Sequence, residues 1–338
     1  MVEFEEKKNI NLKEDIKCSQ MLENIFSFLE KKKKLDLIIY NKEIRKKFGV
    51  NIQDYKISSG KYKKGGKNGF GREYTLNKNN LIFEGEYLNG KRNGKGKEYY
   101  FNGNLKFEGE YLKGKKWNGK GYNINNILDL KIENGNGKGK DYNYYGYLEY
   151  KGEYSNGEKN GKGKEYYDGK FKCSEEFTVG WEKLVKFPTD SELLFEGEFL
   201  RGERNGKGKE YYKDGKLKFE GEYLNGKRNG KVKEYFNNGN LKFEGKYING
   251  RKWNGNGYNK DGIIDFEIKD GSGKGKEYYD NDELKFEGEY LCGDKNGKGK
   301  EYYFYKELKF EGEYLNGERN GKAKEFNLTN QIEFEGII

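Results

Sequence analysis

Aromatic and glycine residues alternate with charged residues along most of the chain, in short runs that repeat. In FEGEYL, residues 83–88, two aromatic residues and a glycine fall on one side of an extended strand, and two glutamates and a leucine fall on the other. The next segment, NGKRNG at 89–94, has two Asn-Gly pairs, which supply the positive φ angles of a tight turn. GKGKEYY at 94–100 is extended again. The pattern predicts a β-hairpin, with the basic residues between the two Asn-Gly pairs in its loop.

This hairpin unit recurs along the chain, mostly every 24 residues. Degenerate units near Leu130 and Phe266 and a degenerate first copy at Gly60 bring the total to about eleven, and a partial copy follows at Phe334. Units 136 residues apart match without a gap, so a block of several repeats was duplicated. We predict a repeat array over residues 58–338, with an insertion at 171–190. The phrase FEGEY or a close variant begins at Phe83, Phe107, Tyr150, Phe195, Phe219, Phe243, Phe286 and Phe310.

A single hairpin is only marginally stable, so the repeats predict hairpins stacked into a quasi-one-dimensional array. Each recurring glycine would leave a flat floor for a neighbouring Tyr or Phe ring. Disorder is the alternative, but it gives no reason for the aromatic and glycine phases to persist over the whole array. We expect a mainly β protein, an elongated antiparallel hairpin ribbon about 100 Å long with one grooved face.

Residues 1–57 have few glycines and many Leu, Ile and Lys residues, and they predict a short α-helical N-terminal region. Apolar residues follow helical spacing in 18–34 and again in 35–49. One interpretation is a helical cap that shields the open edge of the first hairpin. The other is a separate binding module.

The amino-acid composition limits the catalytic sites, the metal sites and the cellular compartment that the sequence allows. The 338-residue sequence has no histidine, which excludes Ser-His-Asp and Cys-His catalysis and His-ligated zinc. Its three cysteines are far apart in sequence, which indicates a reducing compartment rather than a disulfide scaffold. The first residues do not form a signal peptide, and no apolar run approaches the length of a membrane helix. We expect a cytoplasmic protein, with attachment to a membrane or the cytoskeleton as the alternative.

Two recurring motifs have simple explanations. The GKGK segments lack the following Ser or Thr and the helix of a phosphate-binding loop. Glutamate pairs occur in nearly every unit, whereas catalytic carboxylate pairs occur once, in a cleft. The glutamates are therefore interpreted as a charged strand face opposite the lysines of GKGK. We expect no enzyme activity, no cofactor and no metal site.

The net charge of +10 is spread along the chain. The basic pairs Lys91-Arg92 and Lys227-Arg228 would recur at one end of the hairpins as a basic rail, which is either simply solvated or binds anionic phospholipid. Trp117 and Trp253, in the predicted turn regions, either pack at corners or contact a partner. Nucleic-acid binding is disfavoured, because the aromatic residues are in core phase and acidic residues are nearly as numerous as basic ones.

FEGEYLNGKRNGKGKEYY resembles the MORN repeat, which starts with aromatic-Glu-Gly-x-aromatic and continues with G-x-x-x-G-x-G. The resemblance covers about residues 58–338, with Tyr where Trp is common in the family, as at Tyr87, Tyr111 and Tyr223. It implies protein interaction, self-association or membrane apposition, and it does not imply catalysis. We therefore expect a scaffold that binds protein partners or an anionic membrane surface.

The segment MLENIFSFLEKKKKLDLIIYNKEIRKKF, within residues 20–48, is similar to an F-box, without the usual opening Leu-Pro. This resemblance implies the alternative function, a substrate adaptor of a ubiquitin ligase whose repeats bind the substrate. The surface that contacts Skp1 would then include Leu22, Ile25, Phe26 and Leu29.

Overall fold

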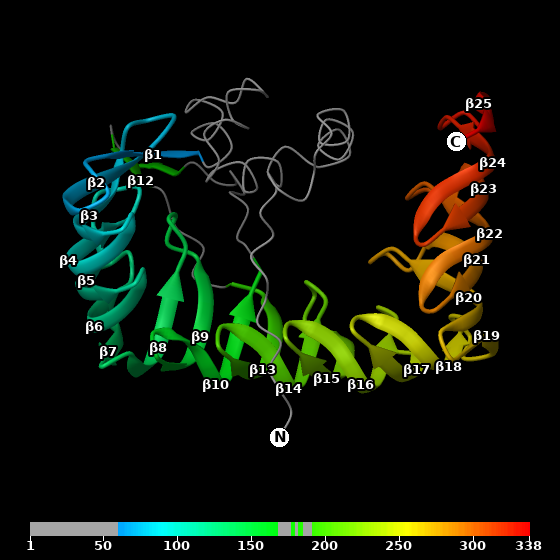
Figure 1. Cartoon of the computed structure of the whole chain (residues 1–338), viewed down its shortest axis with the longest axis horizontal. Coiled ribbons are helices and arrows are strands. Elements are labelled where there is room, and N and C mark those ends of the chain that lie inside the picture. The colour runs from blue at the N-terminus through cyan, green and yellow to red at the C-terminus, as the bar shows by residue number, and fades with distance from the viewer. Residues whose placement is uncertain (1–59, 168–176, 180–181, 185–190) are drawn as a thin grey trace, which may run out of the picture. The chain divides into compact units, whose positions relative to one another are not determined.

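The computed structural model describes residues 60–167, 177–179, 182–184 and 191–338 (Figure 1). The described residues form strands and turns and contain no helix. The helices predicted within residues 1–57 lie outside the described residues. The chain divides into a smaller unit, residues 1–64 and 72–81, and a larger unit, residues 65–71 and 82–338.

Most strands of the repeats are eight or nine residues long, as the alternating pattern predicts. The first ten are β1 (Lys61–Lys64), β2 (Gly69–Thr75), β3 (Leu81–Leu88), β4 (Lys91–Tyr99), β5 (Leu105–Leu112), β6 (Lys115–Tyr122), β7 (Leu128–Glu133), β8 (Asn136–Tyr142), β9 (Leu148–Ser155) and β10 (Glu158–Tyr166). The next eight are β11 (Phe177–Val179), β12 (Glu182–Leu184), β13 (Leu193–Leu200), β14 (Glu203–Tyr211), β15 (Leu217–Leu224), β16 (Lys227–Tyr235), β17 (Leu241–Ile248) and β18 (Arg251–Tyr258). The last seven are β19 (Ile264–Lys269), β20 (Ser272–Tyr278), β21 (Leu284–Leu291), β22 (Asp294–Tyr302), β23 (Leu308–Leu315), β24 (Glu318–Phe326) and β25 (Ile332–Ile337).

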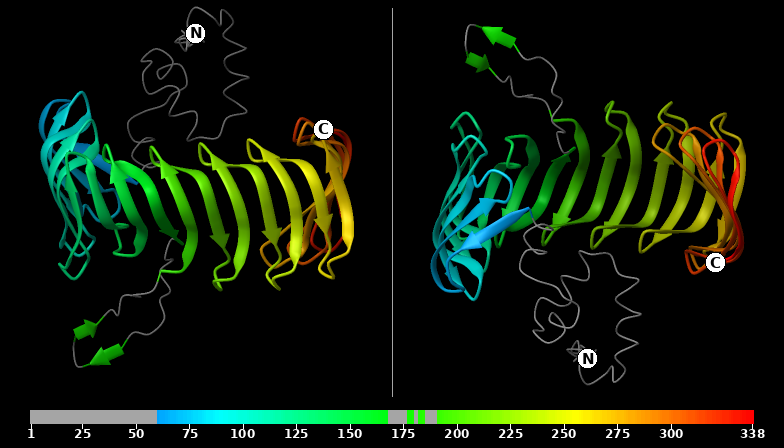
Figure 2. Two further views of the ribbon diagram at one scale, coloured as in Figure 1. Left: turned by 90° about the horizontal axis from the view of Figure 1, so that it is seen from below. Right: turned by 90° about the horizontal axis from the view of Figure 1, so that it is seen from above.

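The main sheet is long, open and antiparallel and has 23 strands. In the larger unit each of its strands pairs with the next one along the chain (Figure 2). The consecutive pairing is interrupted once, where β10 pairs directly with β13. The strands between them, β11 and β12, form a two-stranded sheet of their own. In the smaller unit β1 pairs with residues 72–75 of β2. The predicted hairpin sheet is thus confirmed.

The hairpin turn is shorter than the sequence pattern predicts. Asn89 and Gly90 alone form it, with φ angles of 52° and 80°, and Leu88 pairs directly with Lys91. The second Asn-Gly pair, 93–94, instead lies in a bulge inside β4, where the register shifts. The prediction that both pairs belong to the turn was wrong, because two residues with positive φ already close the hairpin.

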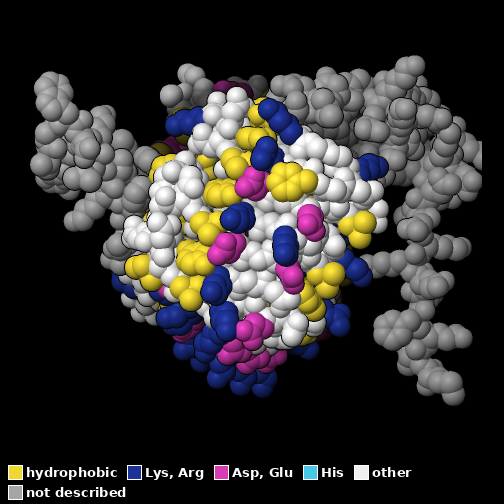
Figure 3. Space-filling view, turned by 90° about the vertical axis from the view of Figure 1, so that its left-hand side faces the viewer, with side chains coloured by type: hydrophobic (Ala, Val, Ile, Leu, Met, Phe, Trp, Pro, Cys, Tyr) yellow, Lys and Arg dark blue, Asp and Glu magenta, His cyan; other side chains and the backbone are white. Residues whose placement is uncertain are grey.

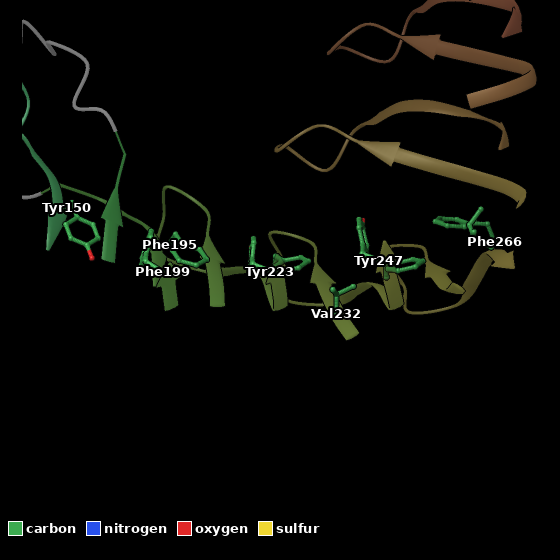
Figure 4. Packing of buried hydrophobic residues seen from close by; sticks show 10 residues of the cluster. Tyr150, Phe195, Phe199, Tyr223, Val232, Tyr247 and Phe266 are labelled. Atoms are coloured by element: carbon green, nitrogen blue, oxygen red, sulfur yellow. The ribbon is translucent and has the colours of Figure 1, made fainter. Parts of the chain in front are cut away.

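Aromatic rings fill the inner face of the sheet, defined here as the face of Phe83 and Tyr87. The first aromatic ring of most hairpins is fully buried, and the rings meet edge to face along the array (Figure 4). The Phe195 ring, for example, lies 5.4 Å from that of Phe199 and 5.2 Å from that of Tyr223. A Cβ atom on Gly208 would lie 2.5 Å from the Phe195 ring. The prediction that glycines leave room for rings is confirmed.

Hydrogen bonds join neighbouring hairpins at both ends of the strands. At the end away from the Asn-Gly turn, the buried Tyr212 hydroxyl donates to the Tyr235 carbonyl at 2.8 Å. At the turn end, the Lys113 N–H donates to Asn93 Oδ1 at 3.1 Å, and the Gly114 N–H donates to the Arg92 carbonyl at 2.8 Å. These bonds satisfy polar groups that a lone hairpin would leave to water.

Candidate partner-binding surface

Arg92 and Arg228, predicted to lie in loops, lie in strands β4 and β16 and point to the inner face. The Arg92 guanidinium carbon lies 3.9 Å from the Phe83 ring centroid, and its Nη1 donates to Glu98 at 2.6 Å. The position predicted for these residues was wrong, since the turn ends one residue before Lys91. Lys91 and Lys227 are exposed at the turn end, and their role in binding a partner stays a prediction.

The same arrangement recurs along the inner face, where a Lys or Arg cation lies 3.9 to 4.9 Å from the first ring of its hairpin. We call this series of cations, with the carboxylates between them, the ionic ladder. Arg228 shows it best, because its guanidinium joins Glu210 of the preceding hairpin at 2.6 Å and Glu234 of its own at 2.7 Å. Lys252 of the next hairpin reaches Glu234 at 3.5 Å.

The ladder carboxylates are strongly held in their charged form. Burial alone would raise the pKa of Glu234, but Lys252 and Arg228 outweigh it and lower that pKa to about 2. Glu98, which stands 136 residues earlier in the duplicated block, has its pKa lowered to about 2 in the same way, chiefly by Lys116. The Tyr247 hydroxyl donates to Glu234 at 2.6 Å. The ionic ladder therefore holds the hairpins together and offers few free charges to a partner.

Trp117 and Trp253 do not lie in turns. They are bulge residues of β6 and β18, in the units that precede the degenerate hairpins. The Gly135 N–H donates to the Trp117 carbonyl at 2.7 Å, and a Cβ on Gly135 would lie 2.7 Å from the Trp117 ring. Each indole is half-buried, and that of Trp117 packs against the turn of the next hairpin. A partner contact by these residues stays a prediction.

On the other side of the sheet, the outer face, glutamates and lysines alternate from strand to strand over β13–β17. Glu196 pairs with Lys209, Lys209 with Glu220, and Glu220 with Lys233. Several such neighbours form ion pairs, such as Lys233 with Glu244 at 3.2 Å, and their side chains are about half exposed. The predicted face of glutamates opposite the GKGK lysines is confirmed.

Two rows of these charges border a groove whose floor is the row of glycine backbones. We call it the trough. Over β8–β18 it has a volume of about 1200 Å³, and a further section of about 400 Å³ covers β4–β6. Figure 3 shows the strip of backbone between two rows in which basic and acidic side chains alternate. The aliphatic stems of the lysines form its walls, so the trough offers apolar surface between charged rims.

A row of exposed leucines runs beside the trough, next to the Asn-Gly turns. One leucine stands at the end of the first strand in most repeats, with 38 to 52% of its surface exposed. Sequence reasoning placed this residue on the outer side but did not select it as a contact. The signal was its recurrence at an outward position of FEGEYL. The leucine row consists of Leu88, Leu112, Leu200, Leu224, Leu291 and Leu315.

The F-box candidates Leu22, Ile25, Phe26 and Leu29 lie outside the described residues. Within the part of the chain that the structure describes, no helix has the length and hydrophobicity of a membrane span.

The model of the MORN repeat family matches six segments of the chain, at residues 83–105, 150–170, 195–216, 219–241, 286–304 and 310–326. The resemblance to MORN repeats is thus confirmed. A search of curated proteins found no match. The F-box resemblance stays a prediction.

Proposed function

We propose that this chain, which carries six MORN repeats, is a non-enzymatic scaffold that binds protein partners along its outer face. MORN repeats are commonly protein-binding or membrane-binding repeats. The observation that carries the proposal is the trough with the leucine row beside it, because monomeric proteins seldom expose apolar side chains in a repeated line. Most of the inner face is occupied by its own rings and ion pairs.

The alternating charges in the middle of the trough suit a protein partner. Over β13–β16 positive and negative side chains alternate along the rims at the strand spacing of about 4.8 Å, whereas Lys151 faces Lys164 and Lys231 faces Lys246. The alternating section attracts a negatively charged lipid surface less strongly than an all-lysine row would, and a polypeptide can place opposite charges against it.

The spacing of the repeats favours a helical partner segment that crosses the strands. One hairpin advances the sheet by about 9.6 Å, and seven residues of an α-helix advance by about 10.5 Å. A helix with an apolar residue in every heptad would therefore meet successive leucines over two or three hairpins. Flanking charges on the helix would pair with the rims of the trough.

Charge reversal in the trough tests this function. The full-length double variant Lys207→Glu/Lys231→Glu changes two exposed rim lysines, and partners captured from native lysate are quantified by mass spectrometry against wild type. We expect the trough variant to lose them. The matched control is Lys91→Glu/Lys227→Glu, which reverses two exposed lysines at the turn end. Loss in the control alone would contradict the proposal and favour the basic rail.

Two further arms separate the alternatives. Flotation of the full-length protein with anionic vesicles at physiological salt tests membrane binding, and we expect the protein to stay behind. Recovery of Skp1 and a cullin by wild type, but not by an Ile25→Asp/Phe26→Asp variant, would assign the adaptor function to residues 1–57.

A further inference from the structure

A cavity of about 370 Å³ opens on the inner face between β15 and β21 of the larger unit. Its lining is rich in cations and also holds three carboxylates, Glu234, Glu277 and Asp280. The basic side chains are Lys218, Arg228, Lys242, Arg251, Lys252 and Lys276. Basic side chains thus outnumber acidic ones in the lining of this cavity.

Each carboxylate of the lining is already engaged. Glu234 is shared by Arg228 and Lys252, as described above. Asp280 binds Lys218 at 2.7 Å, and Glu277 binds Lys295 at 3.2 Å. Two of the remaining lining cations, Arg251 and Lys276, have carboxylate partners outside the lining.

Lys242 is the exception. Among the described residues no carboxylate lies within ion-pairing distance of its ammonium group. Its Nζ lies 5.4 Å from the Phe236 ring centroid and 5.0 Å from that of Tyr278. The electron-rich faces of these two rings partly offset its positive charge. This half-buried ammonium has Glu234 and Asp282 in its surroundings but neither at ion-pairing distance, and partial desolvation of a charge is costly, which makes this position a place for an anion.

The duplicated block supplies an internal comparison. Lys106 stands 136 residues before Lys242 and has Asp141 at 3.9 Å. The position equivalent to Asp141 is Glu277, which turns to Lys295 and accepts the Tyr290 hydroxyl at 2.8 Å. The Glu277 side chain, which is longer than that of Asp141, thus pairs with a lysine of the next hairpin. Lys242 therefore lacks the carboxylate partner that Lys106 has.

We propose that this cavity binds a small phosphate monoester, with Lys242 as the cation that holds the phosphate group. A phosphate carries close to two negative charges and three acceptor oxygens, enough to face Lys242 and the neighbouring cations together. The volume exceeds that of a phosphate alone and leaves room for a small organic group. The site lies on the inner face, so its test is independent of the trough.

The pH dependence of binding follows from the surroundings of Lys242. Burial lowers the pKa of Lys242 to about 8; Glu234 and Asp282 oppose this shift, and Lys252 and Lys218 add to it. The ammonium form binds the anion, so affinity falls as pH rises through about 8. A bound phosphate raises the pKa of Lys242 in turn.

Isothermal titration of the full-length protein tests the site, with inorganic phosphate, O-phosphoserine and serine as probes at constant ionic strength. We expect saturable binding of the two phosphates and none of serine. Lys242→Met should weaken binding by about tenfold or more, Lys242→Arg should retain most of it, and Lys106→Met is the matched control with wild-type affinity. Tighter binding of O-phosphoserine identifies the monoester, and equal binding identifies free phosphate as the ligand.

A second measurement covers the case in which Lys242→Met fails to fold. The acylation rate of Lys242 in the wild-type protein is followed by peptide mass spectrometry with and without phosphate. Phosphate should slow acylation of Lys242 and leave Lys106 unchanged. Equal affinity of wild type and a folded Lys242→Met variant, or absence of both binding and protection, would overturn the proposal.

Discussion

Replacing one carboxylate of the ionic ladder tests whether the ladder stabilises the array. We consider Glu234→Gln, which keeps the shape of the side chain and removes its charge. Glu234 is 7% exposed and lies between Arg228 at 2.7 Å and Lys252 at 3.5 Å. The neutral amide would leave the two cations facing each other with one fewer counter-charge.

The magnitude follows from the pKa of Glu234. Its value falls from an ordinary 4.5 to about 2, which corresponds to about 3 kcal/mol of stability from the charged form. Because the pKa is lowered in the folded state, this stability is present above about pH 4.5 and is lost as pH falls towards 2. Glu234→Gln should therefore cost about 3 kcal/mol at pH 7, and the difference from wild type should shrink towards zero near pH 2.

Urea unfolding at pH 7 and pH 3, followed by fluorescence, measures the free energy of unfolding of both proteins. Hydrogen exchange of the β16 and β17 amides locates the loss, since repeat arrays open locally. Glu244→Gln is the control, because Glu244 forms an exposed pair with Lys233 and should cost less than about 1 kcal/mol. A deficit that is the same at pH 3 as at pH 7 would refute the electrostatic reasoning and point to packing.

Three further substitutions test the packing of the repeat. Gly208→Ala should cost about 1 to 3 kcal/mol of unfolding free energy because its methyl group would overlap the Phe195 ring; Ala323→Gly, at the equivalent position, should cost under about 1 kcal/mol, and equal costs would contradict the ring-on-glycine argument. Cys292→Asn should stabilise by about 0.5 to 1 kcal/mol, because Cys292 holds a φ of 51° at a turn position where Asn is preferred; no rise in melting temperature would count against this view of the turn. Tyr212→Phe should cost about 0.5 to 1.5 kcal/mol by leaving the Tyr235 carbonyl without its donor, whereas Tyr305→Phe, at a residue 74% exposed, should cost almost nothing.

The sequence predicted the elements and their faces well, because alternation and repetition act over neighbouring residues. Phe83, Gly85 and Tyr87 share a face as expected, and the glutamates of FEGEY oppose the GKGK lysines. These features need only the two-residue period of a strand. The glycine floor was also predictable, since a ring and a missing side chain recur in fixed phase.

The position of Arg92 could not be predicted in the same way. NGKRNG contains the same turn dipeptide twice, and residues 89–90 and 93–94 are both suited to positive φ. Only the pairing of the strands decides which dipeptide closes the hairpin, and that choice moves Arg92 from a loop onto the Phe83 ring. The Lys242 cavity could not be predicted from the sequence for a related reason. It depends on whether the Glu277 carboxylate turns towards Lys295 or towards Lys242.

The two residues that follow the turn can be compared from one hairpin to the next along the array. In eight hairpins the second position is Lys or Arg, whose cation covers a ring, and Arg228 there also neutralises two carboxylates of the ladder; the two degenerate hairpins have Gly137 and Gly273 instead. The first position is exposed or near the surface and accepts either sign, as Lys227 and Glu203 show. Stability therefore restricts the inner residue of each pair and leaves the outer one free to vary. Differences in partner choice between hairpins should accordingly reside on the outer face. Charge reversal at Arg228 should unfold the array, whereas reversal at Lys227 should leave the free energy of unfolding unchanged, as urea unfolding of the two variants would measure.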